Sequence, residues 1–200
     1  MPGKRIALTG GIATGKTTVA NRLKELGAVI LDADEFARRA VRPGSGGWRA
    51  LREWLGAEFF DPDGALRRRK LREKIVGDPD ARKKLDQILH PFILGAMEEE
   101  WESNRVRNPR ATVIFDIPLL FEGGFDKSFD IIVLVYAPPE VQVERLTSRD
   151  DLTREQAQKT LAIQLPIESK KAKSDYIIDN SGDLDHTLRQ TLEVWEAISR

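Results

Sequence analysis

Short apolar runs alternate with amphipathic stretches along most of the chain. The runs are rich in β-branched residues and predict five strands, at Arg5–Thr9, Val29–Asp32, Thr112–Ile117, Ile131–Tyr136 and Tyr176–Asp179. Several of these runs are apolar throughout, which is typical of inner parallel strands that are covered on both faces. The pattern therefore predicts an α/β fold in which helices flank both faces of a mostly parallel sheet.

Helical periodicity fills the intervals between the predicted strands. It predicts helices over residues 16–26, 34–41, 47–55, 65–76, 80–104, 139–149, 153–165 and 184–198. Gly27 and Gly77 mark helix ends, and Thr153 with Gln156 forms a capping box. No convincing strand lies between Pro43 and Asn108, so residues 43–108 are expected to form a helical insertion.

Composition and charge exclude several classes of binding and catalytic function. The chain has 200 residues, with 32 basic and 32 acidic residues, so no overall field attracts nucleic acid or an anionic membrane. The absence of cysteine excludes disulfides, thiolate catalysis and Cys-ligated zinc, and two histidines leave little material for a His-rich metal site. With no signal peptide or membrane span in the pattern, we expect an unprocessed cytoplasmic protein that binds neither nucleic acid nor membrane.

The strongest motif is GGIATGKT, from Gly10 to Thr17, which lies between a predicted strand and a predicted helix. It matches the phosphate loop G-x-x-x-x-G-K-[ST], whose backbone N–H groups and helix N-terminus bind phosphate groups. In this interpretation Lys16 binds the β- and γ-phosphates, the Thr17 hydroxyl binds Mg²⁺ and Thr18 contacts the α-phosphate. Ala13 is expected to keep a negative φ because it is not glycine. The alternative is a glycine-rich turn without a ligand.

Carboxylates follow two of the predicted strands. Asp32 and Asp34, read as the end of a strand, are expected on one side at the carboxyl edge of the sheet, where ligands of α/β folds bind. One would then act as a base and the other as a metal ligand, and we favour Asp34 as the base. The alternative is that Asp34 caps the next helix and Asp32 is solvated. Asp116 ends the third strand and is either a Mg²⁺ ligand or a turn residue before Pro118.

Arg145 and Arg149 are four residues apart on one face of the helix after the fourth predicted strand. Small phosphoryl-transfer kinases close an arginine-bearing lid over ATP, which neutralises charge and excludes water. A solvated helix face is the alternative interpretation.

Six segments carry a resemblance to a known family, at residues 8–20, 26–38, 89–93, 116–122, 144–150 and 162–182. Together they resemble the dephospho-CoA kinase family over nearly the whole chain. The phosphate loop alone would indicate only a nucleotide-binding superfamily, whereas the order and spacing of the other five segments are more specific. The chain departs from the family pattern at Ala13-Thr14, where Gly-Ser is common, and at Thr160-Leu161, where Arg-Ile is frequent.

The resemblance implies a P-loop fold similar to the nucleoside-monophosphate kinases, with a five-stranded parallel sheet in the order 2-3-1-4-5. It implies a core of residues 1–42, 109–138 and 174–200, a helical acceptor-binding insertion at 43–108 and a lid at 139–173. The implied reaction transfers the γ-phosphoryl group of ATP, with Mg²⁺, to the ribose 3′-hydroxyl of dephospho-CoA and yields CoA and ADP. A monomer is favoured.

The motif and the resemblance together predict the site residues. The expected catalytic residues are Lys16, Asp34 and Arg145. Expected nucleotide contacts are Gly11, Ala13, Thr14, Gly15, Lys16, Thr17, Thr18, Arg145 and Arg149. Expected acceptor contacts are Thr9, Asp32, Asp34, Arg68, His90 and Leu120, and expected Mg²⁺ ligands are Thr17, Asp32 and Asp116.

Two of these residues have structural alternatives. Arg68 lies in the basic stretch 67–74, which also fits a solvated helix. His90 precedes Pro91, and a histidine before a helix break is more often a packed or capping residue than a catalyst.

Two other functions compete with this assignment. The first is another small-molecule kinase, of the nucleotide or shikimate type. The second is a GTPase switch, but guanine recognition there needs Asn-Lys-x-Asp, and the nearest match, Ala172–Asp175, lacks the asparagine.

Overall fold

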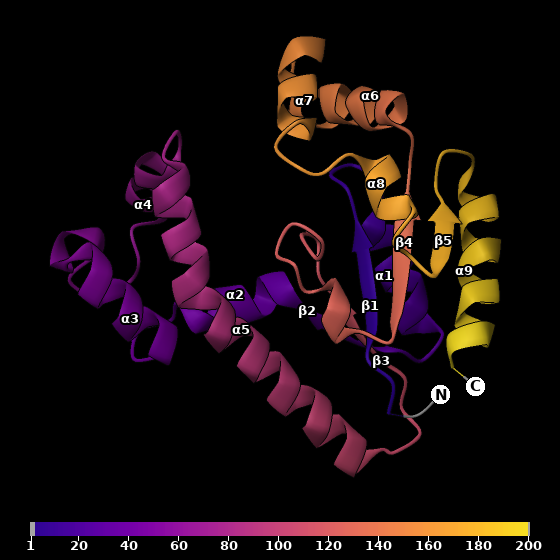
Figure 1. Ribbon diagram of the computed structural model, residues 1–200, viewed down its shortest axis with the longest axis horizontal. Helices are drawn as coiled ribbons and strands as arrows, with labels where there is room; N and C mark the ends of the chain where they lie inside the picture. Colours follow the sequence, from indigo (N-terminus) through magenta and orange to yellow (C-terminus); the bar gives the residue numbers. More distant parts are fainter. Residues whose placement is uncertain (1–2, 200) are drawn as a thin grey trace. The chain divides into compact units, whose positions relative to one another are not determined.

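The computed structural model, which describes residues 3–199, is built around a five-stranded sheet (Figure 1). The strands are β1 (Ile6–Gly10), β2 (Val29–Asp32), β3 (Val113–Asp116), β4 (Ile131–Tyr136) and β5 (Tyr176–Asp179). Their order is β2-β3-β1-β4-β5, and β1 pairs in parallel with both β3 and β4. The predicted parallel sheet and its strand order are therefore confirmed, with strand ends displaced by a residue.

Helices cover both faces of the sheet, as the apolar strands predicted. On one face, α1 (Lys16–Glu25) and α9 (Leu184–Ile198) pack on alternate strand residues such as Val133 and Val135. On the other face, α8 (Ile167–Lys171) packs on Leu134 and Tyr136, which alternate with Val133 and Val135 along β4. The phosphate loop directly follows β1 and therefore lies at the carboxyl edge of this sheet.

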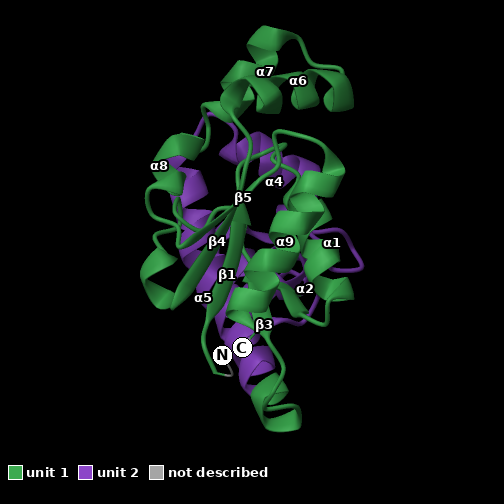
Figure 2. Ribbon diagram, turned by 90° about the vertical axis from the view of Figure 1, so that its right-hand side faces the viewer, with its two compact units in different colours: residues 1–31, 103–200 green, residues 32–102 purple. Residues whose placement is uncertain are grey.

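The chain forms two compact units, which Figure 2 distinguishes by colour. Unit 1 comprises residues 1–31 and 103–200 and contains most of the sheet, together with α6 (Pro139–Asp150), α7 (Arg154–Leu161), α8 and α9. Unit 2 comprises residues 32–102 and contains α2 (Ala33–Ala40), α3 (Gly46–Leu55), α4 (Arg68–Ile75) and most of α5 (Pro79–Arg107). Each unit has its own cluster of buried apolar side chains.

Several helix boundaries differ from the predicted ones. The predicted helix 153–165 ends at Leu161 and is followed by the separate short helix α8, which the pattern did not predict. Helix α5 continues through Pro91, so the helix break expected beside His90 is wrong. The capping box of Thr153 and Gln156 is confirmed, and Gly27 and Gly77 follow helix ends, as expected. Both glycines have positive φ.

Within the described residues 3–199, no helix is both long enough and apolar enough to cross a membrane.

Candidate functional site

The phosphate-loop motif joins β1 to α1 and forms a tight loop. Gly15 precedes the first turn of α1 with a φ of 85°, and a side chain at this position would overlap Nδ2 of Asn180. Glycine is therefore required at Gly15 both by the backbone conformation and by the close approach. Because Gly15 offers no side-chain cap, the first N–H groups of α1 are left for an anion.

Ala13 has a φ of 58°, so the predicted negative φ is wrong. The N–H and the hydroxyl of Thr14 both donate to the carbonyl of Gly11, at 3.3 and 2.8 Å, and close a four-residue turn. Ala13 is the third residue of this turn, a position at which some turn types require positive φ. The turn therefore imposes a left-handed conformation on a residue that has a Cβ.

Lys16 and Asp116 form an ion pair in which Nζ lies 2.5 Å from Oδ1. Their side chains are only 16% and 8% exposed. Asp116 ends β3, the strand beside β1, so the sheet brings the predicted phosphate ligand and a predicted metal ligand together. Lys16 is the first residue of α1, so this ion pair lies at the junction of the phosphate loop and α1.

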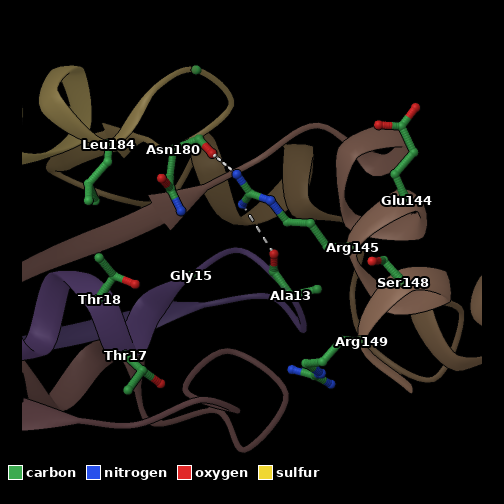
Figure 3. A pocket seen from close by; sticks show the side chains of 11 residues that line it. Ala13, Gly15, Thr17, Thr18, Glu144, Arg145, Ser148, Arg149, Asn180 and Leu184 are labelled. Atoms are coloured by element: carbon green, nitrogen blue, oxygen red, sulfur yellow. Dashed lines mark hydrogen bonds between the residues drawn. The ribbon is translucent and has the colours of Figure 1, made fainter. Parts of the chain in front are cut away.

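Arg145, on α6, reaches the phosphate loop from the side (Figure 3). Its guanidinium donates to the carbonyl of Asn180 at 2.7 Å and to the carbonyls of Ala13 and Thr14 at 3.3 and 3.4 Å. Arg145 therefore lies against the phosphate loop, and its contact with nucleotide stays a prediction.

Asn180 was not predicted as a site residue, although it is buried against the loop. Its Nδ2 donates to the carbonyl of Thr14 at 2.7 Å, and its Oδ1 accepts the hydroxyl hydrogen of Thr187 at 2.8 Å. Its position directly after β5, at the carboxyl edge of the sheet, is the sequence signal that could have found it.

A cavity of about 710 Å³ lies beside the phosphate loop in unit 1. It is lined by Ala13, Gly15, Thr17, Thr18, Glu144, Arg145, Ser148, Arg149, Asn180, Gly182 and Leu184. A volume of this size lies within the range of small-molecule sites. It brings together six of the residues predicted to contact nucleotide.

Arg149 lines this cavity while bound to its neighbour. It donates two hydrogen bonds of 2.7 Å to the carboxylate of Asp150. The hydrogen bond raises the pKa of Arg149 and lowers the pKa of Asp150. If Arg149 contacted a nucleotide, its guanidinium would either give up its hydrogen bonds to Asp150 or keep them and donate a further one.

Asp32, in unit 2, caps helix α2. Its Oδ1 accepts from the backbone N–H groups of Asp34 and Glu35 at 2.8 and 3.4 Å, and its Oδ2 lies 3.9 Å from Arg38. The alternative that Asp34 is the cap is therefore wrong, as is the placement of Asp34 in a strand. The physical reason is that β2 ends at Asp32 and α2 begins one residue later, which leaves the Asp34 side chain exposed.

A second cavity, of about 400 Å³, lies within unit 2. Its lining consists of Asp34, Ala37, Arg38, Val41, Leu66, Arg68, Leu71, Arg72, Ile75, Leu85 and Leu89. The structure thus brings Asp34 and Arg68, both predicted acceptor contacts, to one cavity. Three arginines and several aliphatic side chains suit an acceptor with anionic and apolar parts.

The remaining predicted residues lie in different surroundings. Thr9 is buried and donates to the carbonyl of Pro118 at 3.3 Å, and Leu120 is fully buried. His90 Nε2 lies 3.8 Å from Oδ1 of Asp86, one turn earlier on α5. Acceptor contacts by these residues stay predictions.

Among residues 3–199, no three or more His, Asp or Glu side chains gather in a group that could hold a metal ion by themselves. Mg²⁺ in phosphotransferases takes many of its ligands from phosphate oxygens and water and needs one or two protein ligands. The Thr17 hydroxyl, at the cavity, and the Asp116 carboxylate, beside Lys16, have the chemistry for that limited role.

Comparison with known proteins gives consistent matches. The family model described as "Dephospho-CoA kinase" matches residues 4–186. The dephospho-CoA kinase of Anaeromyxobacter dehalogenans is 43% identical over 177 residues, which cover 88% of this chain and 83% of that protein. The crystal structure of TT1252 from Thermus thermophilus superposes with a TM-score of 0.82 at 32% identity and 98% coverage of each chain. A dephospho-CoA kinase from Campylobacter jejuni superposes with a TM-score of 0.73 at 25% identity, covering 98% of this chain and 96% of that one.

Proposed function

This chain belongs to the dephospho-CoA kinase family, and from that premise we propose how its residues transfer the γ-phosphoryl group of ATP to the 3′-hydroxyl of dephospho-CoA. The reaction makes the chain a phosphotransferase of coenzyme A synthesis. The observation that carries the residue assignments is the ion pair of Lys16 and Asp116 at the phosphate loop, together with the cavity of about 710 Å³ beside that loop.

In this proposal the nucleotide occupies the 710 Å³ cavity of unit 1. The phosphate loop and the first turn of α1 bind its phosphates through backbone N–H groups. Thr18 and Arg145 flank the cavity, so the hydroxyl of Thr18 contacts the α-phosphate and the Arg145 guanidinium stabilises negative charge on the transferred group.

The Lys16 ammonium would leave Asp116 and bind the β- and γ-phosphate oxygens when ATP enters. The Asp116 carboxylate, together with the Thr17 hydroxyl, would hold Mg²⁺, which neutralises phosphate charge when bound. Asp32 stays a weaker prediction as a metal ligand because its carboxylate already caps α2.

Unit 2 would bind the acceptor in its 400 Å³ cavity, where Arg68 pairs with acceptor phosphate groups. Asp34 would accept the proton of the acceptor's 3′-hydroxyl. The hydroxyl oxygen would then bond to the γ-phosphorus while the bond between that phosphorus and ADP breaks. The exposed Asp34 carboxylate is accessible for this role.

An ADP-release assay with ATP, Mg²⁺ and separate acceptors tests the proposal. We expect turnover with dephospho-CoA and none with AMP, adenosine or shikimate. Asp34→Asn should retain dephospho-CoA affinity and lower kcat by about 100-fold or more, since general bases contribute 10²–10⁴-fold. A loss of acceptor affinity with unchanged kcat would make Asp34 a binding residue instead. The cytoplasmic location and the monomeric state stay predictions.

A further inference from the structure

Two glutamine side chains hold the main chain of the phosphate loop at one residue, Ile12. The Nε2 group of Gln142, on α6, donates to the Ile12 carbonyl at 2.6 Å. The Oε1 atom of Gln164, between α7 and α8, accepts from the Ile12 N–H at 2.9 Å. The backbone partners fix which amide atom faces the loop in each case, because a carbonyl needs a donor and an N–H needs an acceptor.

The Gln142 amide is packed closely against the loop. Gln142 is only 3% exposed, and a Cβ added to Gly11 would lie 2.6 Å from its Nε2 atom. The absence of a side chain at Gly11 therefore leaves room for the glutamine amide.

Gln164 is held in turn by a buried ion pair. The next residue, Leu165, donates its backbone N–H to Oε1 of Glu122 at 3.1 Å. The same oxygen lies 2.6 Å from Nζ of Lys170, a side chain that is fully buried. A buried ammonium needs such a partner, so the pair fixes the segment that presents Gln164 to the loop.

The position of Ile12 gives these contacts a consequence for phosphate binding. Ile12 directly precedes Ala13, the non-glycine residue with a φ of 58°. Its two hydrogen bonds fix the peptide groups on both sides of Ile12 and so limit relaxation of the unfavourable Ala13 conformation. Gln142 and Gln164 both come from residues 139–173, outside the phosphate-loop motif.

We propose that Gln142 and Gln164 are positioning residues that hold the phosphate loop in its phosphate-binding conformation by hydrogen-bonding both backbone groups of Ile12. This inference rests on the proposed function, in which the loop binds the phosphates of ATP. It extends that function to two side chains that do not line the nucleotide cavity.

One substitution made at two positions tests the proposal. Gln164→Glu keeps an acceptor for the Ile12 N–H, whereas Gln142→Glu replaces the donor with an acceptor that faces the Ile12 carbonyl. We expect Gln142→Glu to raise the KM for ATP and the inhibition constant of ADP by about 10-fold or more, as expected for loss of a buried hydrogen bond. Gln164→Glu should stay within about 3-fold of the wild type, and Gln164→Leu should resemble Gln142→Glu.

The nucleotide series separates loop positioning from general destabilisation. The inhibition constant of AMP, which lacks a β-phosphate, should change much less than that of ADP in Gln142→Glu. Gln158→Glu, at an exposed position on α7, is the matched control and should leave both constants unchanged. Gln142→Leu removes the donor without adding a buried charge, and thermal melting of each variant establishes that it is folded at the assay temperature.

Equal losses of ADP and AMP binding, or unchanged ADP binding in folded Gln142→Leu, would overturn the positioning role. Failure of the proposed function gives a different result, because the wild-type chain itself would then show no ADP inhibition and no turnover of dephospho-CoA.

Discussion

At the scale of single residues, the pairing of Lys16 with Asp116 links stability to catalysis. The pair is largely buried, so each charge compensates the other in a region with little water. The sequence motif predicts a phosphate-binding role for Lys16 and gives no sign of this buried pairing. The structure instead shows that removing Lys16 takes away the ammonium paired with the largely buried Asp116 carboxylate.

We therefore predict that Lys16→Met lowers both activity and stability. The kcat should fall by about 100-fold or more, because a preorganised charge that stabilises the transition state is lost. The melting temperature should also fall, because Asp116 loses its cation. A steady-state ADP-release assay and a thermal melt measure the two effects.

The double variant Lys16→Met/Asp116→Asn separates the two effects. Removing the carboxylate charge as well should restore much of the melting temperature and none of the kcat. If stability recovered together with activity, the loss in Lys16→Met would be a folding effect, and the phosphate role of Lys16 would be wrong.

At the scale of secondary-structure elements, α8 is attached to β4 by polar and apolar contacts. The Tyr136 hydroxyl donates to Oε1 of Glu168 at 2.7 Å, and Ile167 packs in the same cluster. The Lys171 ammonium lies 4.4 Å from the centre of the Tyr136 ring, within cation–π range. These contacts explain why a helix of five residues is stable beside the sheet.

The Tyr136 contact predicts a specific loss of stability at alkaline pH. The hydrogen bond to Glu168, followed by burial, raises the pKa of Tyr136 from 10.0 to about 12. Because folding raises the pKa of Tyr136, its protonated hydroxyl contributes to the free energy of unfolding. This contribution is fully present below pH 10 and disappears as the pH rises toward 12. Urea unfolding between pH 8 and 11.5 should show a steeper alkaline decline in the wild type than in Tyr136→Phe.

The other tyrosine provides the control for this measurement. Tyr176→Phe leaves the bond between Tyr136 and Glu168 in place and should therefore keep the additional alkaline decline. Parallel pH profiles for the wild type and Tyr136→Phe would contradict the assignment.

Local signals in the sequence account for the elements that were predicted correctly. The buried strands are β-branched runs, and α7 begins at a capping box, so each carries its own signal. Helix α8 has no comparable signal, because its five residues depend on distant partners such as Glu122 and Tyr136.

The predicted site shows the same division between local and distant causes. The phosphate loop was recognised because its residues are consecutive. The left-handed Ala13 was missed because the turn, and not the residue type, imposes its φ. Asn180, Gln142 and Gln164 were missed because their hydrogen bonds reach the loop from more than 100 residues away.

At the scale of the whole molecule, unit 1 and unit 2 have different apolar cores. The core of unit 1 includes Leu23 on α1, and the core of unit 2 includes Leu51 on α3, both fully buried. These two clusters share no residue. The proposed nucleotide cavity lies in unit 1 and the proposed acceptor cavity in unit 2, so the two binding functions depend on different cores.

We predict that Leu51→Ala destabilises unit 2 selectively. Truncating a buried leucine costs about 2–5 kcal/mol, and the cavity left by Leu51 lies within the unit 2 core. Hydrogen exchange should accelerate in α3 and α4 while amides of β1, β4 and α1 keep most of their protection. Leu23→Ala, the same change in unit 1, should give the opposite pattern. Leu51→Ala should also keep its ADP affinity and lose turnover of dephospho-CoA, whereas equal acceleration of exchange in both units would show that they unfold together.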